Sequence, residues 1–196
     1  DFTRFENCIF NYNDADAGGA VAINAYQIYT QFIDCQFFQN KAENGGGAIF
    51  LNGTFNAARF IGCRFEKNST AKFGGGAVWH EGAGLPGKSV SYSNCHFVEN
   101  WCPVTDNNYT EGGAIYLRIS GDVDTISMEH CVFLRNKSYS SAAVFCNLEN
   151  PAGLHFNLQH CSFEGNYSWL GAAFQLSGVG NGGTVLVHNC LWSEQK

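Results

Sequence analysis

The chain repeats one short pattern along its length: a Cys, an aromatic residue two positions later and, in all units but the last, an Asn three positions after that. Successive Cys residues are 27 positions apart between Cys8 and Cys35, and up to 36 apart between Cys95 and Cys131. Repeats of this length are typical of solenoids, in which each unit buries its apolar side chains against the next. The Cys column consists of Cys8, Cys35, Cys63, Cys95, Cys131, Cys161 and Cys190.

The composition fits short buried strands joined by tight turns. Charged residues make up 14% of the chain, against about 25% in an average domain, and the chain contains 23 Gly. The repeats continue through all 196 residues without a linker, so we expect one domain over residues 1–196. The net charge of -6 argues against a nucleic-acid partner. We expect no membrane span, because no apolar run approaches the ~18 residues that a spanning helix needs.

Each unit predicts three short strands. Apolar residues three and five positions before Cys, such as Phe60 and Ala58, alternate as in a strand with one inward face. The residue just before Cys is Asn, Asp, Gly or His, which tolerate the left-handed backbone of a corner. Cys and the aromatic residue then point inward on a second strand, and the third strand begins at Gly-Gly-Ala. A ladder of Asn is expected at the corner between them: Asn13, Asn40, Asn68, Asn100, Asn136 and Asn166.

Equivalent strands of successive units should lie side by side and in register. This arrangement predicts an all-β fold, a right-handed parallel β-helix of about six coils with three short strands per coil. Successive coils would rise by about 4.8 Å.

The pairing of Phe-x-x-Asn with Gly-Gly-Ala-Ile resembles the repeats of the polymorphic outer membrane proteins, adhesin-like surface β-helix proteins. Phe37 to Asn40 with Gly46 to Ile49 carries both halves, as do the two units that follow it. The resemblance implies an extracellular or cell-surface adhesive or structural rod. Its partners would be copies of itself stacked end to end, adjoining coils of a longer chain, or host and matrix glycans and proteins.

The nine cysteines are better explained as buried thiols than as a disulfide framework. Seven share one inward register, where neighbouring Cβ atoms point the same way and a disulfide would be strained. A bridge between Cys102 and Cys146 is the alternative for the two cysteines outside the ladder. We expect no zinc, because no Cys-x-x-Cys pair is present, and no cofactor.

A second ladder should run along the outer side of the third strand. Its aromatic members could stack sugar rings or pack against a partner, and the alternative is a ladder that stabilises only itself. These residues are Phe50, Trp79, Tyr116 and Phe145.

Five Asn-x-Ser/Thr sequons are candidates for glycosylation, at Asn52, Asn68, Asn108, Asn136 and Asn166. Three of these are ladder residues, and an Asn stacked inside a corner cannot also carry an exposed glycan. Asn52 and Asn108 are therefore the better candidates. The long segment 101–111 between Asn100 and Gly112 is a candidate binding loop, or a tolerated insertion.

We expect no catalytic residues. Carboxylates are scattered, with Glu66 and Glu164 three coils apart, and the corner position of His130 and His160 explains them without a metal. The expected function is a non-catalytic structural β-helix, an adhesin stalk or filament subunit. The alternative is a polysaccharide-binding or polysaccharide-degrading β-helix enzyme, which would need paired carboxylates near one sugar bond. Because a bare strand edge is expected at each end, the chain should be a segment of a longer rod or should associate end to end.

Overall fold

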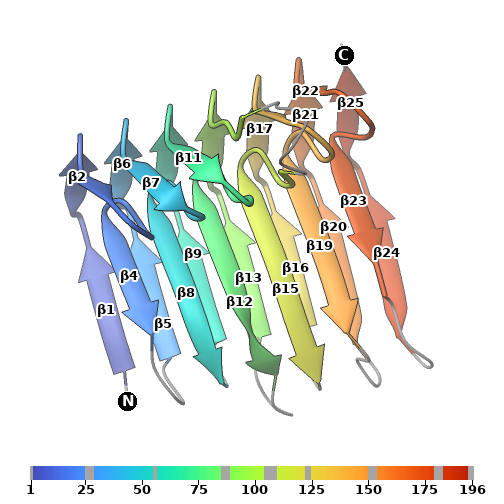
Figure 1. The fold of residues 1–196 in the computed structure, drawn as a ribbon. Helices are drawn as coiled ribbons and strands as arrows, with labels where there is room; N and C mark the ends of the chain where they lie inside the picture. Colours follow the sequence, from blue (N-terminus) through green and yellow to red (C-terminus); the bar gives the residue numbers. More distant parts are fainter. Residues whose placement is uncertain are drawn as a thin grey trace.

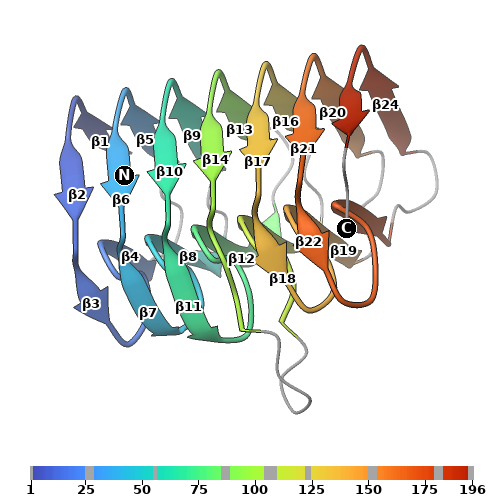
Figure 2. The ribbon, with the colours of Figure 1, turned by 90° about the horizontal axis from the view of Figure 1, so that it is seen from above.

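A computed structural model of the chain describes residues 2–24, 29–54, 57–84, 89–103, 110–121, 125–149, 154–178 and 183–193. All regular structure in these ranges is β-strand, and all pairing between strands is parallel. Figure 1 shows the coils side by side from β1 to β25, and Figure 2 shows from above that each coil passes through its sheets in the same order. The predicted right-handed parallel β-helix is confirmed.

Four sheets surround the core, named A to D in the order in which the chain enters them. Sheet A consists of β1 (Phe2–Glu6), β5 (Tyr29–Ile33), β9 (Ala57–Ile61), β13 (Ser89–Ser93), β16 (Thr125–Glu129), β20 (His155–Gln159) and β24 (Thr184–His188). Sheet B consists of β2 (Ile9–Asn11), β6 (Gln36–Phe38), β10 (Arg64–Glu66), β14 (His96–Val98), β17 (Val132–Leu134), β21 (Ser162–Glu164) and β25 (Leu191–Ser193).

Sheet C is short, and sheet D closes the coil. Sheet C consists of β3 (Asp14–Ala15), β7 (Lys41–Asn44) and β11 (Ser69–Lys72), with a separate pair β18 (Lys137–Ser138) and β22 (Tyr167–Ser168). Trp101 bridges Ser69 to Lys137 between the two parts. Sheet D consists of β4 (Val21–Asn24), β8 (Ile49–Thr54), β12 (Val78–Gly84), β15 (Ile115–Gly121), β19 (Val144–Glu149) and β23 (Phe174–Ser177).

Sheet C was not predicted from the sequence, which indicated three strands per coil and none between the ladder Asn and Gly-Gly. The backbone of this segment also pairs from coil to coil. Lys41 N, for example, donates to Asn13 O at 2.8 Å, and Ser69 N donates to Asn40 O at 3.0 Å. The coils that contribute to sheet C therefore have a fourth, short strand. An extended segment between two in-register corners lies next to the equivalent segment of the neighbouring coil and can pair with it.

Strand pairing brings equivalent residues of the repeat directly next to each other. Phe65 pairs with Phe37 on one side and with Phe97 on the other. The Phe37 and Phe65 rings stack at 4.7 Å with an interplanar angle of 3°. Phe32, from sheet A, packs edge-on against Phe37 at 5.8 Å. The core is thus a continuous column of stacked rings, with each coil buried by its neighbours.

Left-handed backbone marks two corners of every coil. The predicted corner before each Cys is confirmed, with φ from 50° at Asp34 to 62° at Gly62. A second left-handed position comes just before the ladder Asn, at residues such as Lys67, where φ is 55°. The sequence predicted this corner from its Asn ladder but not the left-handed residue before the Asn, since residues such as Lys and Glu do not favour that conformation in isolation. The hydrogen bonds of the following Asn hold it in place.

The two glycines of Gly-Gly-Ala have separate roles. Gly46, the first, has a φ of +60°, and a Cβ there would collide with the carbonyl of Ile49. Gly47, the second, would place a Cβ against the Gly76 carbonyl of the next coil. The first glycine makes the turn and the second allows the coils to approach to strand-pairing distance.

Among the described residues, no helix is long and apolar enough to cross a membrane.

Candidate functional site: side-chain ladders and surface hollows

The Asn ladder is a continuous chain of hydrogen bonds along the corner between sheets B and C. Asn100 Nδ2 donates to the Asn136 side-chain oxygen at 3.1 Å and to the Phe65 carbonyl of the preceding coil at 3.0 Å. The same bonds recur from coil to coil, and the ladder residues from Asn40 to Asn166 are buried. Each amide therefore ties together three successive coils.

This geometry bears directly on the sequons. A glycan is attached to Nδ2, and in Asn68 and Asn136 this atom is buried and donates two hydrogen bonds. In Asn166 it donates to the Phe133 carbonyl at 2.9 Å. Asn52 is exposed on β8, in register with Glu81. Asn108 lies outside the described residues.

The Cys ladder lies inside the corner between sheets A and B. All nine cysteines are free thiols, so the alternative bridge between Cys102 and Cys146 is not formed. Each ladder thiol approaches backbone carbonyls, as Cys63 Sγ does with Ile61 O and Phe32 O, both at 3.4 Å. Burial raises the pKa of Cys35 to about 11 and that of Cys146 to about 12. Since the thiolate is the reactive form, these groups are unreactive at neutral pH.

The aromatic ladder of sheet D is largely closed, which favours the alternative of a ladder that stabilises only itself. Trp79 and Tyr116 are 9% exposed and Phe145 is 5% exposed. Trp79 and Tyr116 stack at 4.0 Å, and Phe73 packs edge-on against Trp79 at 6.1 Å. The turn before Gly-Gly folds over the rings, so that Gly45 lies against the Trp79 ring. Phe50 is partly buried at one end of this cluster.

The carboxylates and histidines considered for catalysis do not lie together in one site. Glu66 is engaged by Arg64 at 2.8 Å, whereas Glu164 lies at the equivalent position three coils further on. The His130 and His160 rings stack at 4.8 Å on the exposed corner. Among the described residues, no group of three or more His, Cys, Asp or Glu side chains could hold a metal ion.

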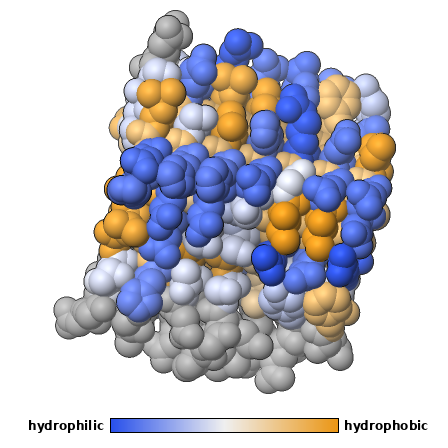
Figure 3. Space-filling model, turned by 180° about the vertical axis from the view of Figure 1, so that it is seen from behind, coloured by the Kyte–Doolittle hydropathy of each residue, from blue (hydrophilic) through white to orange (hydrophobic). Residues whose placement is uncertain are grey.

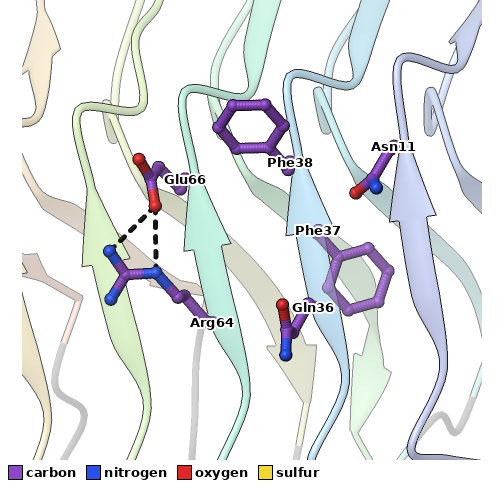
Figure 4. Close-up of a pocket in the computed structure, with 6 residues that line it drawn as sticks. All are labelled: Asn11, Gln36, Phe37, Phe38, Arg64 and Glu66. Carbon is purple, nitrogen blue, oxygen red and sulfur yellow. Dashed lines mark hydrogen bonds and ion pairs between the residues drawn. The ribbon is translucent and has the colours of Figure 1, made fainter.

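A small hollow of about 140 Å³ lies on the outer face of sheet B. Figure 4 shows the Phe38 ring between Asn11 and Glu66, with Gln36 and Arg64 at the next outward positions. Arg64 donates to Glu66 through Nε at 2.9 Å, and Lys67 lies over the Phe38 ring at 5.9 Å. The charged groups here already satisfy one another, so the hollow has little capacity for a ligand.

A larger hollow of about 310 Å³ lies on the outer face of sheet A. Figure 3 shows this side of the molecule, where a band of hydrophilic residues crosses the stack of coils. The sequence analysis did not identify this hollow. The sequence does contain a feature that indicates the hollow, because every outward residue of β13 is the small residue Ser. The hollow is lined by Tyr29, Arg59, Ser89, Ser91, Tyr92, Ser93, Ser127 and Glu129.

The candidate binding loop is described only at its two ends. Trp101 is 46% exposed, and Cys102 beside it is buried. Thr110, on the other side, is buried and donates to the Pro103 carbonyl at 2.6 Å. Residues 104–109 lie outside the described residues.

Residues 34–52 match the family model of the Chlamydia polymorphic membrane protein repeat. That segment runs from the corner before Cys35 through Asn40 and Gly46-Gly47 to the sheet D strand β8. Over these residues the chain is similar to a polymorphic membrane protein repeat. Polymorphic membrane proteins are associated with the outer membrane and the cell surface. The searches of curated proteins and of solved structures found no match.

The matched segment covers most of one coil. The matched segment contains one complete set of the features described above: the left-handed corner, the inward Cys and Phe, the ladder Asn and the Gly-Gly turn. The other coils repeat most of this set, with Ser141-Ala142 and Gly171-Ala172 in place of Gly-Gly in two later coils, and the coils stack in register.

Proposed function

We propose that the chain forms part of a non-catalytic rod on the cell surface, in which stacked coils serve as an adhesin stalk or a filament. The observation that supports the proposal is the match of residues 34–52 to the polymorphic membrane protein repeat. These same residues form the corner, the ladder contacts and the turn of their coil. The most regular side chains are engaged in holding coils together, and polymorphic membrane proteins form a non-enzymatic surface family.

The terminal coils support extension of the rod by further coils of the same kind. On β24, Val185 and Val187 occupy inward positions in register with Phe156 and Leu158, yet they are 47% and 50% exposed. Trp192 stacks on Phe163 at 4.1 Å on one face and is 43% exposed. One more coil, from the same chain or from another copy, would bury these side chains and pair with the strand edge.

Surface location is tested by labelling intact cells that produce the protein with a membrane-impermeant amine reagent. The proposal predicts that the protein is labelled without lysis, as its exposed lysines include Lys41 and Lys72. Labelling only after lysis would refute the surface location.

Coil-on-coil extension is tested with a matched pair of variants on β24. Val187→Lys places a charge where the next coil would pack, whereas Leu186→Lys places it on the outer face of the same strand. Sedimentation of the isolated segment should show concentration-dependent association for the wild type and for Leu186→Lys, and a monomer for Val187→Lys. A wild-type segment that stays monomeric at about 1 mM would contradict end-to-end association.

A further inference from the structure

The hollow on the outer face of sheet A arises from a local change of residue size. All three outward side chains of β13 are Ser89, Ser91 and Ser93. In the preceding coil, Arg59 and Ile61 stand beside Ser91 and Ser93. In the following coil, the small Ser127 lies beside Ser91 and extends the floor of the hollow, and Glu129 lies beside Ser93 on the side opposite Arg59 and Ile61. The result is a trench that follows β13, about 13 Å long at ~3.3 Å per residue.

The two charged side chains that line the trench are available to a ligand, whereas the Tyr29 hydroxyl accepts a hydrogen bond from Gln31 Nε2 at 3.0 Å and the Ser93 hydroxyl accepts one from Asn94 Nδ2 at 3.1 Å. Among the described residues, no ion pair involves Arg59 or Glu129. This contrasts with the hollow on sheet B, where Arg64 is held by Glu66. Tyr29 stacks on Phe2 at 5.5 Å on one side, and its in-register neighbour on the other side is the small Ala57.

We propose that this trench binds a neutral oligosaccharide chain. Hydroxyl groups, a guanidinium and a carboxylate are partners for the paired donors and acceptors of sugar hydroxyls, and a tyrosine ring offers an apolar surface to a sugar face. Arg59 and Glu129 stand on opposite walls, so their charges offset each other and the trench does not favour an acidic or a basic polymer.

The backbone argues against an extended peptide as the ligand. Peptides that bind to sheets add a strand at an edge with unpaired N–H and C=O groups. β13 is paired on both sides, to β9 and to β16, so only side chains face the ligand. An oligosaccharide, which can be recognised through its own hydroxyl groups, is suited to a surface that offers only side chains.

The test is binding of the isolated segment to an array of immobilised neutral and acidic oligosaccharides, followed by calorimetry with the strongest soluble binder. Ser91→Leu fills the trench, and Arg59→Ala removes one wall without adding bulk. Ser162→Leu makes the same change as Ser91→Leu at an outward position of β21, on a different sheet. Urea unfolding of each variant checks that the fold is retained.

The proposal predicts that a neutral oligosaccharide binds, that Ser91→Leu and Arg59→Ala each weaken it at least about tenfold, and that Ser162→Leu does not. Absence of any neutral binder at about 1 mM, or binding that Ser91→Leu and Arg59→Ala leave unchanged, would overturn it. Selective binding of acidic glycans would equally refute the choice of ligand. None of these outcomes bears on the stalk role, which needs no ligand in this trench.

Discussion

Asn100 accepts two hydrogen bonds from Asn68 through a single side-chain oxygen. The backbone N and the side-chain Nδ2 of Asn68 both lie 3.0 Å from Asn100 Oδ1. The side chain of one coil thus satisfies a backbone donor and a side-chain donor of the coil before it. Both residues are fully buried, so water cannot replace these bonds.

Replacing Asn100 with Ala should lower the free energy of unfolding by at least about 3 kcal/mol. The substitution removes two acceptor and two donor interactions and leaves the Asn68 N–H and the Phe65 carbonyl buried without their partner. Urea unfolding measures the change. Asn52→Ala, at an exposed position, is the control and should change the free energy by no more than about 0.5 kcal/mol. Equal effects of the two substitutions would contradict a structural Asn ladder.

Gly47→Ala should be strongly destabilising, by about 3 kcal/mol, because its Cβ would meet the backbone of the next coil at Gly76 and Ser69. Gly171→Ala is a comparison substitution in a later coil, at the position that Gly46 occupies in its own coil, where the nearest atom, Ser140 O, is 3.0 Å from the added Cβ. Thermal unfolding should therefore show a smaller loss for Gly171→Ala. A tolerated Gly47→Ala would mean that the second glycine does not set the distance between coils.

Tyr92→Phe should stabilise the protein by about 1 kcal/mol. Tyr92 continues a column of Phe side chains and stacks on Phe60 at 4.6 Å, and its buried hydroxyl has no hydrogen-bond partner among the described residues. Tyr29→Phe is the control, since it removes the bond from Gln31 Nε2 to the Tyr29 hydroxyl at 3.0 Å and should not stabilise. Chemical denaturation measures the free energy of unfolding of both variants. A loss of stability in Tyr92→Phe would show that the hydroxyl has a partner.

The protein should lose stability at alkaline pH. Burial raises the pKa of the Cys146 thiol from 9.0 to about 12. Above pH 9 the unfolded chain therefore releases this proton before the folded chain does, and the free energy of unfolding falls by about 1.4 kcal/mol per pH unit for such a thiol. The full stability is present below pH 9 and is lost as the pH rises towards 12.

Urea unfolding from pH 7 to 11, with a reducing agent present, measures this dependence. Cys146→Val removes the thiol from a position whose in-register neighbours are Leu117 and Leu176, and should flatten the decline. Stability that stays constant or rises above pH 9 would contradict buried neutral thiols.

The fold could be predicted from the sequence because each coil repeats the residues that its geometry requires. Cys and Phe recur two positions apart, and only in-register stacking brings Phe37, Phe65 and Phe97 together. The short strands of sheet C could not be predicted. Segments such as Lys41–Asn44 are polar and vary between coils, and they form strands only because the corners on both sides are already fixed.

The surface sites were also harder to predict, because they depend on how neighbouring turns and coils are placed around each residue. The spacing places Trp79 and Tyr116 on the outer side of sheet D, but it does not show that the turn at Gly45 folds over them. The trench on sheet A depends on contrast between neighbouring coils. Ser91 forms a floor only because Arg59 stands beside it in the coil before.

Deleting one whole coil tests most directly whether this molecule is a stack of repeated coils in register. Removing residues 63–94 joins Gly62 to Cys95, two positions that follow each other in every unit. The shortened chain should be a soluble protein with far-UV circular dichroism like that of the full chain and one cooperative urea unfolding transition. Removing residues 63–77, which joins sheet A directly to sheet D, should prevent folding. An unfolded whole-coil variant, or equal behaviour of the two deletions, would contradict the stacking of repeated coils in register.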